Sequence, residues 1–457
     1  MTSTPTISIS GTSISNQVMS LITAASSTGS FTQLGDDIDG PSANDNSGWS
    51  VSMSSDGTRV AIGAPYYDKP NSSGNDGLVR IYELQSNNSW SQLGQDIIGV
   101  EYNDYNGHSV SLSADGTRVA IGAYGHNKNG ATDAGHVRIY QYTPSGTSSW
   151  TLYGDIEGQG ASDYSGWSVS LSADGTIVAI GAKYNDANNS QTDNRGHVRI
   201  YQNTSGSTWT KLGQDIDGEA GSTNSHAGDE SGWSVSLSSD GSRVAIGAPK
   251  NSENGNQSGH VRIYEFSNNS WTQLGADIDG EAANDQNGYS VSLSSDGSRV
   301  AISAIAHDGK GHVRIYEYSN NSWSQLGQDI DGEGGGFGFS VSLSSNGSRV
   351  AIGAYTYGGN GVANNAGHVR IYDYVGSSWV KVGVDINGEA AEDKSGYSVS
   401  LSSDGSKIAI GAPYNKGRFN RNQQGHTRIY SLPVDSYQYV WDVDSGGAPS
   451  DGTYRAT

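Results

Sequence analysis

Apolar and polar residues alternate in short runs along most of this chain, and the same runs return at a regular interval. Between Gly232 and Gly275, four such stretches follow one another, with the sequences WSVSLS, RVAIGA, HVRIYEF and WTQLG. Alternation with a period of two is typical of half-buried β-strands. No stretch of the sequence has convincing helical periodicity, so the pattern predicts an all-β chain.

Two landmarks define a long internal repeat. An aromatic residue opens a WTQLG-like segment in seven copies, with successive offsets of 59, 60, 59, 62, 52 and 56 residues: Phe31, Trp90, Trp150, Trp209, Trp271, Trp323 and Trp379. A tyrosine ends the motif G-x-x-R-I-Y in the same seven copies: Tyr82, Tyr140, Tyr201, Tyr264, Tyr316, Tyr372 and Tyr430. Seven copies of four short strands predict a seven-bladed β-propeller of four-stranded antiparallel blades.

The turns and the chain ends support this architecture. Asp240-Gly241 joins the first two strands of one copy, and these residues accept the positive φ of a tight hairpin turn. The last copy lacks a W-x-x-L-G segment after Tyr430, whereas FTQLG at 31–35 precedes the first complete copy. We therefore expect the N-terminal strand to be the outer strand of the last blade and to close the ring.

Three regions are expected along the chain. Residues 1–30 form a Ser/Thr-rich N-terminal segment, and residues 31–432 form the propeller. Residues 433–457 form a C-terminal tail or the start of a further β module, because their YQYVWDV stretch is strand-like and similar to bacterial Ig-like repeats.

Composition and charge narrow the classes of partner. The chain has 26 Lys and Arg against 47 Asp and Glu, which gives a formal net charge of −21 and opposes binding to nucleic acid. With no cysteine, it has neither a disulfide framework nor a thiolate metal site. No apolar run reaches the roughly 18 residues of a membrane-spanning helix, so no membrane span is expected.

Two further motifs recur in phase with the strands. A glycine followed by an aromatic residue opens the first strand in six copies, and the second copy has Gly107-His108 instead: Gly48-Trp49, Gly166-Trp167, Gly232-Trp233, Gly288-Tyr289, Gly338-Phe339 and Gly396-Tyr397. The tripeptide Gly-Ala-Pro ends the second strand at 63–65, 247–249 and 411–413. With these motifs the chain resembles the FG-GAP repeat family, whose better-known members include the N-terminal propeller of integrin α subunits. The resemblance covers 31–432 and implies a seven-bladed propeller with a ligand-binding rim.

The chain departs from that family at its usual calcium loop. Integrin-like blades often carry D-x-D-x-D-G between the first two strands, but this connection is reduced here to S-x-D-G, which has too few oxygen ligands for Ca²⁺. Carboxylates recur instead in the connection from the fourth strand to the next copy, and we take these as candidate Ca²⁺ ligands: Asp37, Asp39, Asp45, Asp215, Asp217, Glu219, Asp277, Asp279, Glu281 and Asp285. The alternative is that they cap turns by accepting backbone hydrogen bonds. Ca²⁺ is the one candidate cofactor.

The loops between the second and third strands vary most in length and sequence. In a propeller they share a rim with the connections between copies, and variable loops on a regular scaffold usually carry specificity. The candidate partner-binding residues on this rim are Tyr66, Tyr67, Asp68, Tyr124, His126, Tyr184, Lys250, His307, Tyr355 and Tyr414.

Three residue types that repeat in nearly every copy are expected to be structural. The histidine of G-H-V-R-I-Y is replaced by Leu78 in the first copy, which favours packing over metal binding. The arginine of the same motif is expected to pair with carboxylates between blades. The tryptophan that opens the fourth strand is expected to anchor neighbouring blades rather than to stack on sugars.

No motif of a catalytic triad, phosphate loop or zinc enzyme occurs in the sequence. We therefore expect a non-catalytic adhesion or structural protein that binds a protein or a glycan through one rim. The partner is an external ligand, a further module of a longer chain or a neighbouring subunit, and the expected location is extracellular, on a cell surface or on a virus-like particle. The alternative is a carbohydrate-active propeller, either a lectin or a glycoside hydrolase.

Overall fold

The computed structural model describes residues 31–70, 74–144, 149–186, 194–219, 228–358, 363–418 and 420–433. The predicted N-terminal segment and the tail from 434 onwards lie outside these residues. Within them, regular structure is β apart from one 3-10 helix, η1 (His307–Gly309). The described part of the chain contains no helix with the length and hydropathy needed to cross a membrane.

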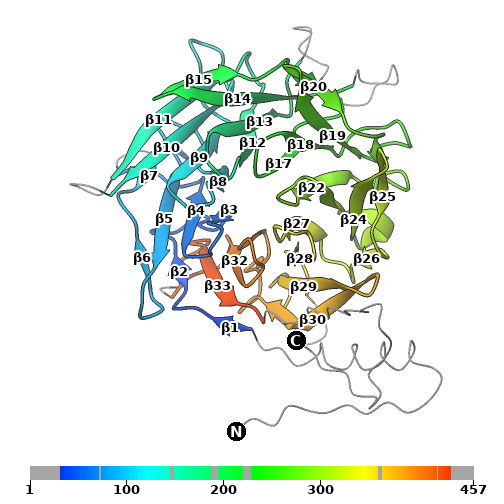
Figure 1. The fold of residues 1–457 in the computed structure, drawn as a ribbon. Helices are drawn as coiled ribbons and strands as arrows, with labels where there is room; N and C mark the ends of the chain where they lie inside the picture. The colour runs from blue at the N-terminus through cyan, green and yellow to red at the C-terminus, as the bar shows by residue number, and fades with distance from the viewer. Residues whose placement is uncertain are drawn as a thin grey trace, which may run out of the picture.

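Seven antiparallel sheets stand around a common axis, which confirms the predicted propeller (Figure 1). Each sheet is one blade, and its first strand lies nearest the axis. The first three blades contain β3 (Ser50–Met53), β4 (Arg59–Ala64), β5 (Leu78–Leu84), β6 (Trp90–Gln92) and β7 (Ile97–Ile98); β8 (Ser109–Leu112), β9 (Arg118–Ala123), β10 (His136–Thr143) and β11 (Ser149–Glu157); β12 (Ser165–Leu171), β13 (Ile177–Ala182), β14 (His197–Ser205), β15 (Thr208–Lys211) and β16 (Ile216–Asp217).

The other four blades repeat this order. They contain β17 (Ser234–Leu237), β18 (Arg243–Ala248), β19 (His260–Ser267), β20 (Ser270–Gln273) and β21 (Ile278–Asp279); β22 (Asn287–Leu293), β23 (Arg299–Ala304), β24 (His312–Ser319), β25 (Ser322–Gln325) and β26 (Ile330–Asp331); β27 (Phe337–Leu343), β28 (Arg349–Ala354), β29 (His368–Val375) and β30 (Ser378–Asn387); β31 (Ser398–Leu401), β32 (Lys407–Ala412), β33 (His426–Ser431), β1 (Thr32–Gln33) and β2 (Ile38–Asp39).

The seventh blade combines both ends of the described chain. β1 pairs antiparallel with β33, with Thr32 opposite Ser431 and Gln33 opposite Tyr430, and β2 pairs with the other end of β33. The N-terminal strand is therefore the outer edge of this blade, in the place that the tryptophan strand takes in the other six.

A closed circle of backbone hydrogen bonds surrounds the axis. Each of seven N–H groups, located just after the first strand, donates to the equivalent carbonyl of the next blade at 2.7–2.9 Å: Ser55 to Ala114, Ala114 to Ala173, Ala173 to Ser239, Ser239 to Ser295, Ser295 to Ser345, Ser345 to Ser403, and Ser403 to Ser55. The contact between the seventh and first blades is thus the same as every other contact in this circle.

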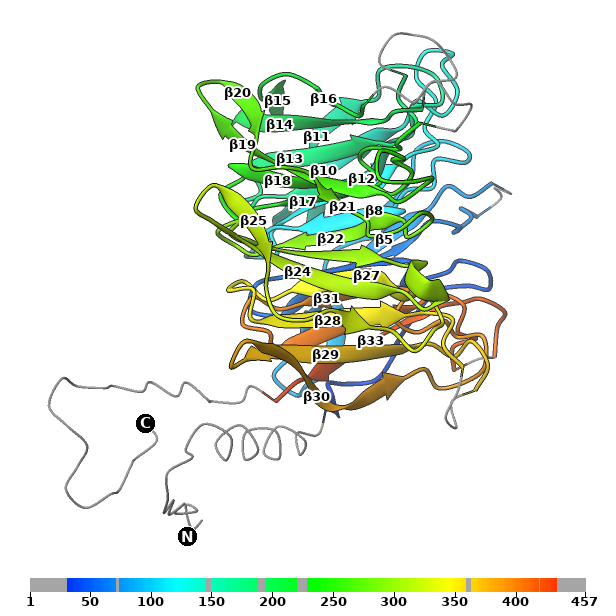
Figure 2. The same ribbon diagram turned by 90° about the vertical axis from the view of Figure 1, so that its right-hand side faces the viewer.

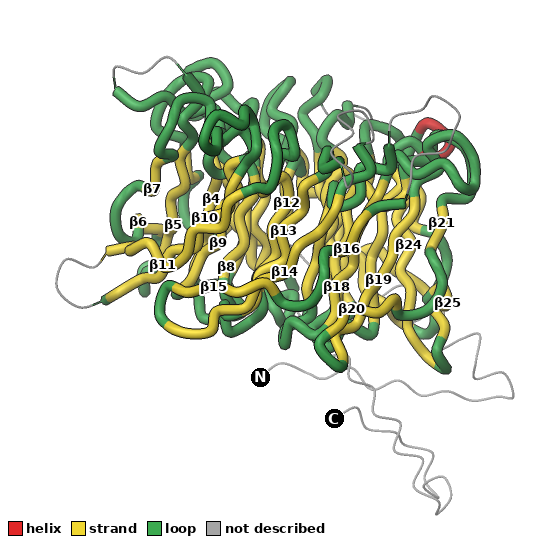
Figure 3. The backbone as a smooth tube through the Cα atoms, turned by 90° about the horizontal axis from the view of Figure 1, so that it is seen from above, coloured by secondary structure: helices red, strands yellow, loops and turns green. Residues whose placement is uncertain are grey.

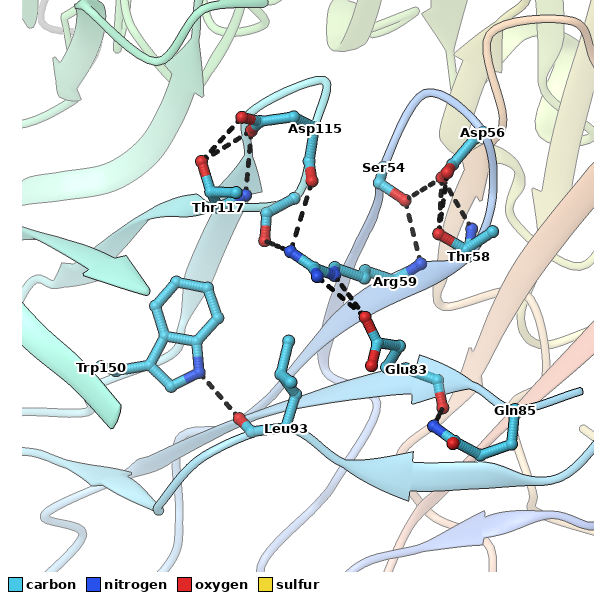
Figure 4. A network of polar contacts seen from close by, with 11 residues as sticks. Ser54, Asp56, Thr58, Arg59, Glu83, Gln85, Leu93, Asp115, Thr117 and Trp150 are labelled. Atoms are coloured by element: carbon cyan, nitrogen blue, oxygen red, sulfur yellow. Dashed lines mark hydrogen bonds and ion pairs between the residues drawn. The ribbon is translucent and has the colours of Figure 1, made fainter. Parts of the chain in front are cut away.

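The hairpin between the first two strands shows how the S-x-D-G sequence forms its turn (Figure 4). The carboxylate of Asp56 accepts hydrogen bonds from the Ser54 hydroxyl at 2.7 Å and from the Thr58 N–H at 2.9 Å. Arg59 pairs with Glu83 in its own blade, and its guanidinium also donates to the Gly116 carbonyl of the next blade at 3.3 Å. The hairpin aspartate thus bonds within its own turn, and the arginine joins adjacent blades.

The repeated tryptophan joins blades at the periphery, as predicted. Its indole Nε1–H donates to a carbonyl of the preceding blade's fourth strand, as Figure 4 shows for Trp150 and Leu93. The six bonds are Trp90 to Leu34, Trp150 to Leu93, Trp209 to Tyr153, Trp271 to Leu212, Trp323 to Leu274 and Trp379 to Leu326. Apolar side chains of two neighbouring blades fill the space inside these anchors, as where Val79 and Ile81 pack with Val110 and Ile121.

Strands run between two faces of the ring that differ in their loops (Figures 2 and 3). One face carries the long loops from second to third strand together with the connections between blades; we call it the loop face. Tyr105, in a connection between blades, donates its N–H to Asn75 in the preceding blade's second-to-third loop at 3.0 Å. The two kinds of loop therefore share one face, as the strand order predicts. The opposite face carries the short hairpins.

Candidate binding face

A tight turn at the start of each blade directs the FG-position residue toward the axis. In the second blade, the His108 N–H donates to the Tyr105 carbonyl at 3.0 Å, and Tyr105 has φ 54°. The residue at this place has positive φ in all seven blades: Asn46, Tyr105, Tyr164, Glu230, Gln286, Gly336 and Lys394. The glycine of the motif is required because a Cβ on Gly48, for example, would lie 2.5 Å from the His426 carbonyl oxygen.

The FG-position side chains of all seven blades form a closed ring around the axis on the loop face. Neighbouring ring centroids lie 4.3–6.0 Å apart, within the range of aromatic pair contacts: Trp49, His108, Trp167, Trp233, Tyr289, Phe339 and Tyr397. All seven are half-buried, so part of each remains open to a ligand.

A second set of tyrosines packs on this ring from the surrounding loops. Tyr105 and Tyr124 stack with centroids 4.9 Å apart, and Tyr124 also contacts His108 at 4.7 Å. The half-buried members of this set are Tyr66, Tyr105, Tyr124, Tyr164, Tyr184, Tyr355 and Tyr414. We refer to the ring and these tyrosines together as the axial aromatic cluster.

Lys183 and Lys394 contact rings of the cluster, and Lys183 is the buried one. The Lys183 Nζ lies 3.1 Å from the Trp167 ring centroid and 4.2 Å from that of Trp233, and the residue is 3% exposed. Burial lowers the pKa of Lys183 to about 7, although the carboxylate of Glu230 opposes the shift. Burial, together with Lys183, lowers the pKa of His108 to about 3, so this imidazole is neutral at physiological pH.

The predicted rim residues fall into two groups. Tyr66, Tyr124, Tyr184, Tyr355 and Tyr414 belong to the axial aromatic cluster.

The remaining rim residues lie outside the axial aromatic cluster. His126 is buried, and its Nδ1 is 3.1 Å from Asp104; His307 is in the same place in the fifth blade. Asp68 is exposed, Tyr67 is half-buried, and the half-buried Lys250 donates to Gln257 at 3.1 Å.

In six of the seven connections between blades, a late aspartate caps its own loop. Asp45 is 3% exposed and accepts the Ser42 N–H at 2.7 Å. Burial raises the pKa of Asp45 to about 6. The equivalent aspartates also accept backbone N–H groups of their loops: Asp104, Asp163, Asp229, Asp285 and Asp393. The turn-capping alternative therefore describes the contacts of Asp45 and Asp285 among the candidate Ca²⁺ ligands.

The other candidate ligands lie at the seams between blades, on the loop face. Glu219 and Glu281 pair with arginines of the following blade, Arg262 at 3.6 Å and Arg314 at 3.2 Å, as predicted. Arg80 and Arg138 instead pair within their own blades, with Asp96 at 2.8 Å and Asp155 at 2.7 Å. The carboxylates of Asp39, Asp217 and Asp279 share a different property: burial raises the pKa of each. Asp215 instead forms an ion pair with Lys211.

Histidines of the third strand meet these carboxylates. His426 Nδ1 lies 3.4 Å from Asp37, and His260 Nδ1 lies 3.4 Å from Asp277. The groups whose ligand atoms all lie within 4.8 Å of one another include Asp37, Glu389 and His426; Glu219, Glu253, His260 and Asp277; Glu281, His307 and His312; and Asp104, His126 and His136. In the first two of these groups, carboxylates that are distant in the sequence gather around one imidazole.

Sequence reasoning did not identify the axial aromatic cluster as a site. Its signal was present, because an aromatic residue or histidine follows the FG-position glycine in every copy. Tyr105 and Tyr164 were also missed, since they lie in the connections between blades rather than in the variable loops.

Comparison with known proteins supports the repeat assignment. A family model described as FG-GAP repeat matches residues 222–264, a stretch that contains β17, β18 and most of β19. A search of curated proteins found no match. The predicted FG-GAP resemblance is confirmed at this repeat, within a chain that folds as a seven-bladed propeller.

Proposed function

We propose that this FG-GAP repeat propeller is a non-catalytic binding protein that recognises a protein or glycan through its loop face, with the axial aromatic cluster as the central contact surface. The observation that carries the proposal is the closed ring of seven half-buried FG-position side chains surrounded by further tyrosines. An integrin-like binding role is consistent with the FG-GAP match. FG-GAP repeats are typical of extracellular proteins, which supports an extracellular or surface location.

Aromatic side chains suit this role for a physical reason. They offer a large apolar face with few rotatable bonds, so little side-chain entropy is lost when a partner binds. Burial raises the pKa of Tyr66, Tyr164 and Tyr184, which keeps their phenols neutral and able to donate hydrogen bonds. Such a surface can stack on sugar rings or bury an apolar protein side chain.

Strain at two of the tyrosines is consistent with a binding role. Tyr105 and Tyr164 have φ of 54° and 56°, a conformation that costs a bulky residue on the order of 1–3 kcal/mol. Asn46 holds the same place in the first blade, and asparagine tolerates this conformation better. Tyrosine is less favourable than asparagine at this place, and it adds two phenol rings to the cluster.

The test is a binding screen with matched variants. Purified protein is applied to an array of defined glycans and to a panel of purified extracellular proteins, and each hit is repeated with the double variant Tyr105→Ala/Tyr164→Ala. We expect affinity to fall about 10-fold or more, the usual cost of losing central aromatic contacts. The control is Tyr102→Ala, which removes a 56% exposed tyrosine from the same connection as Tyr105 but outside the cluster.

Two results would contradict the proposal. One is equal loss of binding in the control and the double variant, since the contact surface would then lie elsewhere on the loop face. The other is turnover of glycosides in a hydrolase panel, which would favour the carbohydrate-active alternative.

A further inference from the structure

We propose that the seam between the third and fourth blades holds one four-coordinate divalent transition-metal ion of the Zn²⁺ type, bound by Glu219, Glu253, His260 and Asp277. The ligand atoms of these four side chains lie within 4.8 Å of one another. This inference concerns a site distinct from the axial aromatic cluster and does not rest on the proposed function.

The buried imidazole is the first observation that points to a ligand. His260 is completely buried, and among the described residues neither Nδ1 nor Nε2 has a hydrogen-bond partner. Nδ1 faces the carboxylate of Asp277 at 3.4 Å, too long for a good hydrogen bond. Neutral imidazole is the form of histidine that binds metals.

The carboxylates supply the second observation. Carboxylate oxygens of Glu219, Glu253 and Asp277 gather at this seam, and the Arg262 guanidinium lies 3.6 Å from Glu219. Three carboxylates around one guanidinium leave a net charge of about −2 beside a neutral imidazole. A divalent cation would neutralise this charge.

The local fold holds three of the four ligands in place. His260 begins β19, Asp277 directly precedes β21, and these two strands pair in the same blade. Glu219 comes from the connection out of the third blade, where the Asn251 amide donates to it at 3.2 Å. Glu253 is exposed, so rotation of its side chain can contract the set around an ion.

The chemistry of the ligands selects the class of metal. One imidazole nitrogen and three carboxylate oxygens match the tetrahedral preference of Zn²⁺, whereas Ca²⁺ takes six to eight oxygen ligands. Glu253 distinguishes this seam, because it adds a third carboxylate to the His-Asp-Glu set that Asp37, Glu389 and His426 form between the sixth and seventh blades.

The experiment measures metal binding by isothermal titration of chelator-treated full-length protein with ZnCl₂, and separately with CaCl₂. We expect one tight Zn²⁺ site, and Glu253→Gln is expected to weaken it by at least about 10-fold. Glu265→Gln is the control, because it removes the same charge from β19, the strand that carries His260, at a place where Glu265 pairs with Arg243. Co²⁺ bound at this site is expected to show the strong visible absorption of tetrahedral coordination, which Glu253→Gln reduces.

Three outcomes would overturn the proposal: no Zn²⁺ binding, Zn²⁺ binding that Glu253→Gln leaves unchanged, or a Ca²⁺ site that excludes Zn²⁺. Because Glu253 is exposed, Glu253→Gln is expected to fold, and circular dichroism of the metal-free variant checks this.

Discussion

Individual residues of the repeat act mainly through hydrogen bonds to backbone atoms of the same or the neighbouring blade. The tryptophan of the fourth strand donates to the preceding blade, and the aspartates of the turns accept from their own loops. The charge of such an aspartate lowers the stability of the fold where burial outweighs its hydrogen bonds, and raises it where the hydrogen bonds outweigh burial. Asp45 and Asp56 have similar roles but opposite pKa shifts.

Asp45→Asn is expected to stabilise the protein near neutral pH. Burial raises the pKa of Asp45 from 3.8 to about 6, so the folded protein binds this proton more tightly than the unfolded chain does. The ionised carboxylate therefore costs stability above about pH 6, and the cost disappears below about pH 4, where both states are protonated. Asparagine can still accept the Ser42 N–H. The Tm of the variant should lie a few degrees above that of the parent at about pH 7.5, and the two Tm values should be equal at about pH 3.5.

Asp56→Asn is the matched control, and we expect it to change the Tm in the opposite direction from Asp45→Asn. Burial alone would raise the pKa of Asp56, but hydrogen bonds from Thr58 and Ser54 outweigh it and lower the pKa. Its carboxylate contributes stability above the unfolded pKa, and this is lost as pH falls through the lowered folded value. The variant should therefore melt below the parent at neutral pH only. Asn346 occupies this place in the sixth blade, so the turn accepts asparagine. Shifts of the same sign in the two variants would contradict the argument.

At the scale of elements, each blade depends on its outer strand twice. That strand pairs with the third strand, and its backbone provides the carbonyl that accepts the tryptophan of the next blade. In the seventh blade, β1 fulfils both roles, because the Leu34 N–H donates to Ile429 at 2.8 Å while the Leu34 carbonyl accepts from Trp90.

Removal of β1 and β2 is expected to destabilise the whole ring. A chain that starts at Gly40 exposes the edge of β33 and leaves the Trp90 indole without its acceptor, which makes edge-to-edge association favourable. We expect a lower Tm and higher-order species in size-exclusion chromatography. The control starts at Phe31 and so retains every described residue. Equal Tm values for the two chains would show that closure does not depend on this strand.

The elements were predictable from the sequence because the repeat makes each one visible seven times. Asp-Gly turns, alternating strands and the tryptophan landmark are local signals, and the structure places strands where they predict. The sites were harder to predict from the sequence, because they form between copies of the repeat. The FG-position rings meet only when all seven blades close around the axis, and Glu219 reaches His260 only across a seam. The sequence also does not show that His126, a predicted rim residue, is buried and stacks on His136 at 3.9 Å.

At the scale of the whole molecule, the contact between the seventh and first blades is equivalent to the contacts between the other blades. The hydrogen bond from Ser403 to Ser55 repeats the bond that every other pair of blades makes, and the aromatic ring closes from Tyr397 to Trp49 at 4.6 Å. Stability should therefore depend on completing seven blades rather than on where the chain begins.

A circular permutant tests this inference. The native chain is cut between the third and fourth strands of its seventh blade, and the equivalent place in the third blade is the turn between β14 and β15. The permutant starts at Ser207 and ends at Gly206, with Leu432 joined to Phe31 through a linker of about four residues, a length common in hairpins. Thr32 lies opposite Ser431, so the join spans a short distance.

We expect the permutant to be monomeric and to melt within a few degrees of a chain spanning 31–432, because each blade keeps four strands and each seam keeps its bonds. The contrasting variant lacks one entire repeat, residues 234–289, and should fail to close, since the remaining blades cannot complete the circle at the same angles. Differential scanning calorimetry and size-exclusion chromatography measure both. A permutant that melts as low as the chain starting at Gly40 would show that the native seam has a special role.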